Sequence, residues 1–293
     1  MRAALYLLLL SACAGTPKRE PSSTTKKTDG PTAPLALTYL GVAGWQLESG
    51  DVTILVDPYF SRPNLDGEIK SDPAAVAARA PKKANLIVVG HSHVDHLLDA
   101  PAVALATGAQ IMGSASTAKV ATSAGVPADH VIPIQGGEDY QFDGYSVRVI
   151  PSLHSALDDK HFMQGQPITV LPPKTFDDYT DGGTFDYLVR VGGREILVTS
   201  TANFIERELV GVHPDVAIIA PGLREQVYDY TCRLMRVLDY PQVVYTTHFD
   251  DWRAAPTDEE PDADLEAFVD EVKRCSPATQ VIIPKHFVRM SAP

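Results

Sequence analysis

The segment GHSHVDHL, residues 90–97, constrains this chain more than any other part of its sequence. The apolar run LIVV directly precedes it and has the continuous hydrophobicity of a strand buried on both faces. In an extended chain, side chains two residues apart point the same way, so His91 and His93 can bind one metal ion together. If the chain then turns, Asp95 and His96 face a neighbouring position. Imidazole and carboxylate groups suit zinc, and manganese and iron are alternatives.

A single histidine is usually an ordinary surface or core residue. Four candidate ligands at the end of one strand are much rarer by chance, so we interpret this segment as a metal site. The formal net charge of −12 argues against nucleic acid as a partner, because phosphate binding needs a basic face. Cys232 and Cys275 could pair in an oxidising compartment, although a buried free thiol is equally ordinary.

The first 34 residues have the pattern of a targeting segment followed by a tether. Residues 3–10 form an apolar run that is too short to span a bilayer. The letters LSAC, ending at Cys13, resemble a bacterial lipoprotein signal, which implies that residues 1–12 are a signal peptide and that lipid is attached to Cys13. The alternative is an ordinary secretory signal with a chance cysteine. Residues 13–34, rich in Pro, Ser, Thr and Lys, predict a flexible linker. We therefore expect a lipid-anchored protein of the bacterial cell envelope.

Strands and helices alternate from residue 35 to the end of the chain, without a second linker. Gly192 and Gly193 separate two apolar segments, which is a strong hairpin signal. The hydrophobic patterns predict helices at residues 73–80, 116–124 and 262–275. They predict strands at residues 35–40, 52–56, 86–89, 131–134, 145–150, 185–191, 195–199, 216–220, 243–246 and 281–283. This α/β pattern suggests two sheets between layers of helices, but periodicity alone leaves the strand order open.

The residues HSHVDH match the HxHxDH signature of the metallo-β-lactamase fold hydrolases. The chain is most similar to the branch that contains ascorbate-6-phosphate lactonase and N-acyl-phosphatidylethanolamine phospholipase D. Its supporting motifs are YLG with GW at residues 39–45 and LVDPYF at residues 55–60. The resemblance covers residues 37–284. It implies one domain at residues 35–293 with a four-layer αββα sandwich.

The resemblance also implies two further metal ligands. His154 follows a predicted strand at the place of the third ligand of the first metal. His248 follows another strand at the place of the last ligand of the second metal. Asp57 resembles the aspartate that the family keeps beneath the site, and we expect it to hydrogen-bond a ligand histidine. Its alternative role is a local Asp-Pro turn.

One departure from the family concerns the aspartate that bridges its two metals. After the hairpin, this chain has Ser200 or Thr201 where that carboxylate is expected, and we favour Thr201. Without a bridging anion, two dications at short range repel each other more strongly. The second metal site is therefore expected to be weaker than the first, or empty.

The sequence thus predicts a hydrolase that attacks an ester, lactone or phosphodiester bond with metal-activated water. The substrate would be a small molecule or a lipid, and the metal one or two zinc ions. With a single ion, Asp95 would orient the water or act as a general base. The alternative is a non-catalytic lipoprotein that uses the fold to bind a ligand or to hold metal. Residues 155–184 could be a lid or binding loop, or simply a solvated insertion.

Overall fold

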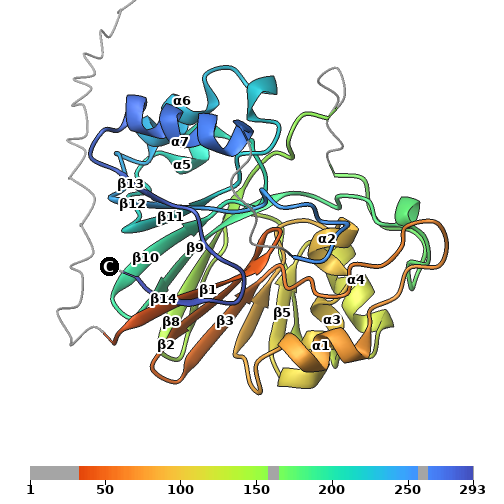
Figure 1. Ribbon diagram of the computed structural model, residues 1–293. Coiled ribbons are helices and arrows are strands. Elements are labelled where there is room, and N and C mark those ends of the chain that lie inside the picture. Colours follow the sequence, from red (N-terminus) through yellow and green to blue (C-terminus); the bar gives the residue numbers. More distant parts are fainter. Residues whose placement is uncertain (1–32, 158–164, 257–262, 293) are drawn as a thin grey trace, which may run out of the picture.

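The computed structural model describes residues 33–157, 165–256 and 263–292. Two seven-stranded sheets pack face to face, and helices cover the outer face of each (Figure 1). This is the predicted αββα sandwich, so the fold prediction is confirmed. The predicted signal peptide and the lipid-attachment residue Cys13 lie outside the described residues, as does nearly all of the linker. None of the helices in the described part of the chain has the length and hydrophobicity needed to cross a bilayer.

The first sheet has the strand order β14-β1-β2-β3-β4-β5-β6. These strands are β1 (Leu35–Gly41), β2 (Gly44–Ser49), β3 (Val52–Val56), β4 (Leu86–Val88), β5 (Gln110–Gly113), β6 (Val131–Pro133) and β14 (Arg289–Ser291). The strands from β3 to β6 run parallel, because helices return the chain between them. The helices of this half are α1 (Pro73–Arg79), α2 (Val94–Leu97), α3 (Ala100–Thr107) and α4 (Ala115–Ser123), with the 3₁₀ helix η1 (Ala128–His130).

The second sheet has the strand order β13-β12-β11-β10-β9-β8-β7. These strands are β7 (Asp139–Phe142), β8 (Tyr145–Pro151), β9 (Phe185–Val191), β10 (Arg194–Val198), β11 (Val216–Ile219), β12 (Val243–Thr246) and β13 (Gln280–Ile282). Helices α5 (Glu206–Leu209), α6 (Tyr230–Val237) and α7 (Ala263–Cys275) cover it, and η2 (Phe176–Asp178) and η3 (Arg224–Gln226) lie in its loops. The hairpin predicted at Gly192 and Gly193 joins β9 to β10, and both glycines have the positive φ that such a tight turn requires.

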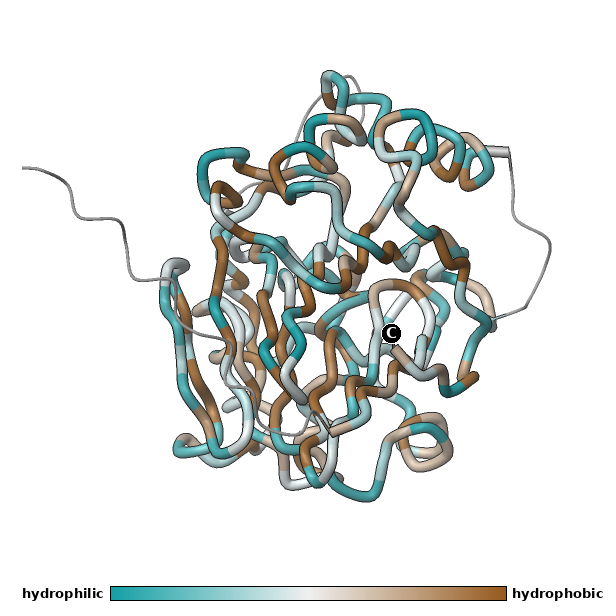
Figure 2. The backbone as a smooth tube through the Cα atoms, turned by 90° about the vertical axis from the view of Figure 1, so that its left-hand side faces the viewer, coloured by the Kyte–Doolittle hydropathy of each residue, from teal (hydrophilic) through white to brown (hydrophobic). Residues whose placement is uncertain are grey.

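The main hydrophobic core lies between the two sheets. Leu37, Tyr39 and Trp45 enter it from the first sheet, and Val147 and Tyr187 enter it from the second. Separate apolar clusters pack each sheet against its own helices. Figure 2 shows the hydrophobic residues concentrated along the interior strands and many hydrophilic ones along the outer loops. The burial of both faces explains why β4 is apolar at every position.

The sequence analysis did not predict several of the strands and helices. Strand β2 lies between the two strands predicted at the start of the domain, and it pairs with both of them. Helices α3 and α6 were also missed, and each has only eight residues. Edge strand β14 has only three residues, and its strand conformation depends on pairing with β1.

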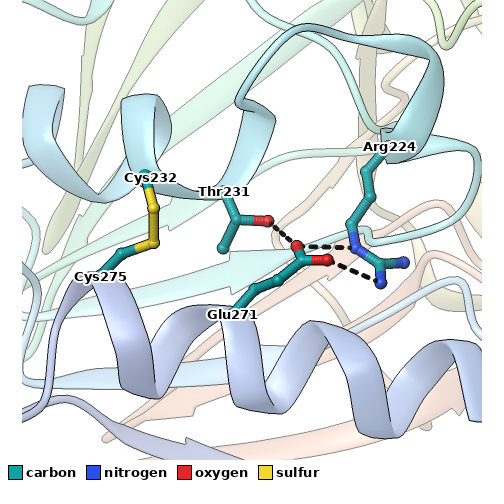
Figure 3. The surroundings of a disulfide bond; sticks show 5 residues. All are labelled: Arg224, Thr231, Cys232, Glu271 and Cys275. Carbon is teal, nitrogen blue, oxygen red and sulfur yellow. Dashed lines mark hydrogen bonds and ion pairs between the residues drawn. A yellow bond between two sulfur atoms is a disulfide. The ribbon is translucent and has the colours of Figure 1, made fainter.

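A disulfide joins Cys232 of α6 to Cys275 of α7, which decides a question that the sequence left open (Figure 3). The buried guanidinium of Arg224 lies beside it and donates to Glu271 (Nε to Oε2, 3.0 Å). Thr231 also donates to that carboxylate, at 2.5 Å. The disulfide links residues that are 43 positions apart. A crosslink of that span contributes about 2–4 kcal/mol by restricting the unfolded chain, so it holds the two outer helices together.

Candidate metal centre

Two pairs of candidate ligands leave the end of β4 in different directions. His91 and His93 lie in extended backbone just after the strand. The chain then enters α2, which begins at Val94 and carries Asp95 and His96. This change from extended to helical backbone is the turn that the sequence analysis required for two neighbouring metal positions.

The two distant histidines come from the second sheet. His154 follows β8, and His248 follows β12. His248 has a positive φ of 54°, and its backbone N–H donates to the Val42 carbonyl at 2.5 Å. The structure therefore brings both histidines to the same edge of the sandwich as the GHSHVDHL segment.

The six side chains form two compact groups. Within each group, one ligand atom from every residue lies within 4.8 Å of the others. The first group is His91, His93 and His154, and the second is Asp95, His96 and His248. The groups are adjacent, because the ring centroids of His91 and His96 are 3.8 Å apart. No residue belongs to both groups.

The donor atoms of the first group suit a tetrahedral metal ion. Nε2 of His91 and Nδ1 of His93 are 3.1 Å apart, close to the ~3.4 Å that two nitrogens would have around zinc. Nδ1 of His154 is 2.9 Å from the Ser155 carbonyl, which leaves its Nε2 for the metal. Burial, followed by the nearby imidazoles, lowers the pKa of His93 to about 3, and burial also lowers the pKa of His91 and of His154. These imidazoles are therefore neutral at physiological pH, which is the form that binds metal.

The second group pairs one carboxylate with two imidazoles. Oδ2 of Asp95 is 3.3 Å from Nε2 of His96 and 3.1 Å from Nε2 of His248. Burial opposes ionisation of Asp95, but the two histidines hold the pKa of its carboxyl well below its ordinary value. Burial likewise opposes charge on His96, yet the Asp95 and Asp57 carboxylates raise the pKa of this imidazole to about 10. His96 must release that proton before its Nε2 can bind a metal.

Asp57 contacts Nδ1 of His96, the ring nitrogen that does not face Asp95. Its side chain is fully buried, Oδ1 accepts from the Gly90 backbone N–H at 2.7 Å, and Oδ2 lies 2.8 Å from Nδ1 of His96. A carboxylate in this place keeps the Nδ1 proton toward itself and leaves Nε2 for the metal. Asp57 also has a positive φ of 39°, so it takes part in a local turn as well. The sequence analysis set these two roles against each other, and the structure combines them.

The two residues at the bridge position differ in their surroundings. The Ser200 side chain lies against Gly90, where an added Cβ would come within 2.4 Å of it. Oγ1 of Thr201 accepts from the Ser155 backbone N–H at 2.8 Å and contacts the Ser155 hydroxyl. Thr201, and not Ser200, lines the cavity above the two ligand groups.

Asp250 lies two residues after His248 and is joined to the turn between β1 and β2. Its side chain is 10% exposed, and its Oδ1 accepts from the Tyr39 hydroxyl at 2.6 Å and from the Val42 backbone N–H at 2.8 Å. Oδ2 lies 3.3 Å from Arg62 and 3.2 Å from Nε2 of His286.

This cluster fastens the segment that carries His248 to the turn between β1 and β2. Val42 of that turn also accepts the His248 N–H, so the metal-site histidine and Asp250 are held by the same residue. The spacing of Asp250 two residues after His248 was a visible signal in the sequence. Arg62 carried no comparable signal, because only the tertiary fold brings it to the carboxylate.

A cavity of about 450 Å³ opens above the two ligand groups. All six candidate ligands line it. Residues 155–157 and 165–184 contribute much of its wall, and the Ser92 backbone N–H fastens that segment by donating to the Asp181 carbonyl at 2.7 Å. The described part of the segment therefore contributes to the wall of the cavity, while most of residues 165–177 are exposed. Asp158, Asp159 and His161 of this segment lie outside the described residues.

Comparison with known sequences agrees with this arrangement. A model described as "Beta-lactamase superfamily domain" matches residues 36–170. A UPF0173 metal-dependent hydrolase of Heliobacterium modesticaldum is 31% identical over 163 residues, which are 55% of this chain and 57% of that protein. Its counterpart in Thermus thermophilus is 27% identical over 187 residues, 63% of this chain and 70% of that protein. The chain spans just over half the length of the first curated relatives that it matches.

Solved structures extend the likeness to nearly the whole chain. Igni18, a metallo hydrolase from Ignicoccus hospitalis, superposes with a TM-score of 0.61 at 18% identity and covers 89% of this chain and 99% of its own. The metallo-β-lactamase fold protein YhfI of Bacillus subtilis gives a TM-score of 0.56 at 13% identity, with coverages of 89% and 100%. At such identities the likeness shows the fold alone. The chain has the metallo-β-lactamase fold, and its two histidine-rich groups have the composition of a metal site.

Proposed function

We propose that this protein is a metal-dependent hydrolase that acts on an ester, lactone or phosphodiester bond. The observation that carries the proposal is the convergence of two adjacent ligand groups on the floor of one cavity. The curated relatives named as metal-dependent hydrolases support it. Zinc is the metal we propose, with manganese and iron as alternatives, because imidazole and carboxylate donors accept all three.

A metal held by this site would lower the pKa of a water toward ~7 and polarise the substrate oxygen. His91, His93 and His154 hold the first position in neutral form. Asp57 keeps the Nδ1 proton of His96, so that Nε2 of His96 can join Asp95 and His248 at the second. If only the first position is filled, Asp95 would orient the attacking water or accept its proton through the carboxylate oxygen that does not face His96 and His248.

The second position is proposed to be the weaker one. Thr201 offers a neutral hydroxyl where the resembling family has a bridging carboxylate, and that hydroxyl is already bonded to Ser155. Neutral hydroxyls are poor zinc ligands, and they do not offset the repulsion between two dications. Occupancy of the second position should therefore depend on the concentration of free metal.

The test is elemental analysis of the protein after dialysis, combined with hydrolysis assays on carboxylic esters, lactones and phosphodiesters. We expect about one ion per chain in the native protein, and more in a Thr201→Asp variant, because the added carboxylate can serve both positions. Removal of metal with a chelator should abolish hydrolysis, and zinc should restore it. A protein that binds ligands equally well without metal and turns none of them over would instead be the non-catalytic module.

We also propose that the protein is anchored in the bacterial envelope through lipid on Cys13. The lipoprotein-like segment at residues 1–13 supports this location. The disulfide between α6 and α7 also supports it, because such bonds persist in oxidising compartments. Metabolic labelling with a radioactive fatty acid should mark the native chain and leave a Cys13→Ala variant unlabelled. Equal labelling of both chains would contradict the anchor.

A further inference from the structure

The wall of the cavity above the ligand groups is largely apolar. Besides the metal-site residues it includes seven hydrophobic side chains, which are Leu157, Phe176, Tyr179, Ala202, Ala220, Leu223 and Trp252. A wall of this kind recognises its ligand by excluding water from apolar surface, while the few polar groups fix the orientation. The ligand groups on the floor would set the position of the reacting bond, and the apolar wall would receive the rest of the substrate.

Two aromatic rings form a flat part of this wall. Phe176 belongs to η2, and Trp252 follows the His248 segment, so the rings come from loops that are far apart in the sequence. Their planes are 15° from parallel, with centroids 5.9 Å apart. Phe176 is 44% exposed, which is unusual for a phenylalanine beside a cavity and leaves ring surface uncovered. A third flat ring could cover that surface in the offset stacking that aromatic pairs favour.

The charges around the wall favour an uncharged ligand. Apart from the metal-site residues, Asp177 is the charged side chain among the described residues that line the cavity. The nearby guanidinium of Arg253 is 5.7 Å from the Trp252 ring centroid and is paired with Asp251. An anionic substituent beside this wall would meet the Asp177 carboxylate and would lose its hydration against apolar surface.

From these features we propose that the substrate is an uncharged carboxylic ester or lactone that carries an aromatic ring. The ring stacks at Phe176 and Trp252, and the carbonyl lies over the two ligand groups. This inference rests on the proposed hydrolase function, and it narrows the three bond types named there to carboxylic esters and lactones.

A matched pair of hydroxamates tests the inference. Acetohydroxamate and benzohydroxamate chelate a metal through the same head group, and they differ in carrying a methyl group or a ring. Binding to the zinc-loaded protein can be followed by tryptophan fluorescence. The chain has two tryptophans, and Trp252 lines the cavity whereas Trp45 does not, so a change in emission that is lost in Trp252→Phe reports on the cavity.

We expect benzohydroxamate to bind about tenfold more tightly than acetohydroxamate, which is the size of one aromatic stacking contact. The ratio of the two affinities should fall toward one in Phe176→Ala and take an intermediate value in Phe176→Leu, which keeps apolar surface without a ring. It should stay unchanged in Tyr228→Ala, because Tyr228 is 85% exposed and does not line the cavity. A 4-carboxylate on benzohydroxamate should weaken binding.

Each contrary result has a distinct meaning. Equal binding of the two hydroxamates to the native protein would overturn the aromatic site and leave the hydrolase proposal standing. Tighter binding of the 4-carboxylate would overturn the preference for an uncharged ligand. If neither hydroxamate binds the zinc-loaded protein, the metal is not accessible from the cavity, and the proposed function fails together with the inference.

Discussion

A His154→Ala variant is expected to lose more than about a hundredfold in both metal affinity and hydrolytic rate. Loss of an outer hydrogen bond to a metal ligand already costs about 10–100-fold, and this change removes a ligand itself. His91 and His93 would remain, but two imidazoles are one protein ligand short of the three that hold a catalytic zinc ion. Elemental analysis after dialysis, together with an ester hydrolysis assay, measures both losses.

The matched control for this variant is His213→Ala. His213 is an exposed histidine that lies 3.7 Å from Asp239 and belongs to neither ligand group. The control should retain the metal and activity of the native protein. A His154→Ala protein that kept its full metal content would show that the first ligand group has been assigned wrongly.

An Asp57→Asn variant is expected to weaken metal binding at the second position by about 10–100-fold. The asparagine oxygen can still accept from the Gly90 N–H, and asparagine tolerates the positive φ of this residue. Its NH₂ group, however, would donate to Nδ1 of His96. That hydrogen bond places the imidazole proton on Nε2, the atom that faces Asp95 and the second metal position.

Zinc titration against a competing chelator measures this change. The first position should keep its affinity, because Asp57 bonds His96 and none of the first three ligands. Asp143→Asn is a suitable control, since Asp143 lies exposed in the turn between β7 and β8. Unchanged affinity at the second position in Asp57→Asn would mean that Asp57 does not select the tautomer of His96.

More of the fold than of the cavity wall could be predicted from the sequence. The apolar run before the histidine motif, the Gly192-Gly193 hairpin and the amphipathic pattern of α7 are local signals, and the structure has the elements that they predict. Strand β2 and the short helices α3 and α6 were missed because their form depends on neighbours in the folded chain. Pairing of β2 with both β1 and β3 outweighs a weak local pattern.

By itself, the sequence determined the chemistry of the donor groups. Alternation in extended chain pairs His91 with His93, and the motif places Asp95 and His96 immediately beyond them. Only the tertiary structure decided how these donors meet His154 and His248. It also decided that Asp250 contacts Arg62 and His286, and that Phe176 stacks on Trp252. The physical reason is that side-chain spacing along one strand is set by local geometry, whereas those contacts join loops that are far apart in the sequence and exist only after the chain has folded.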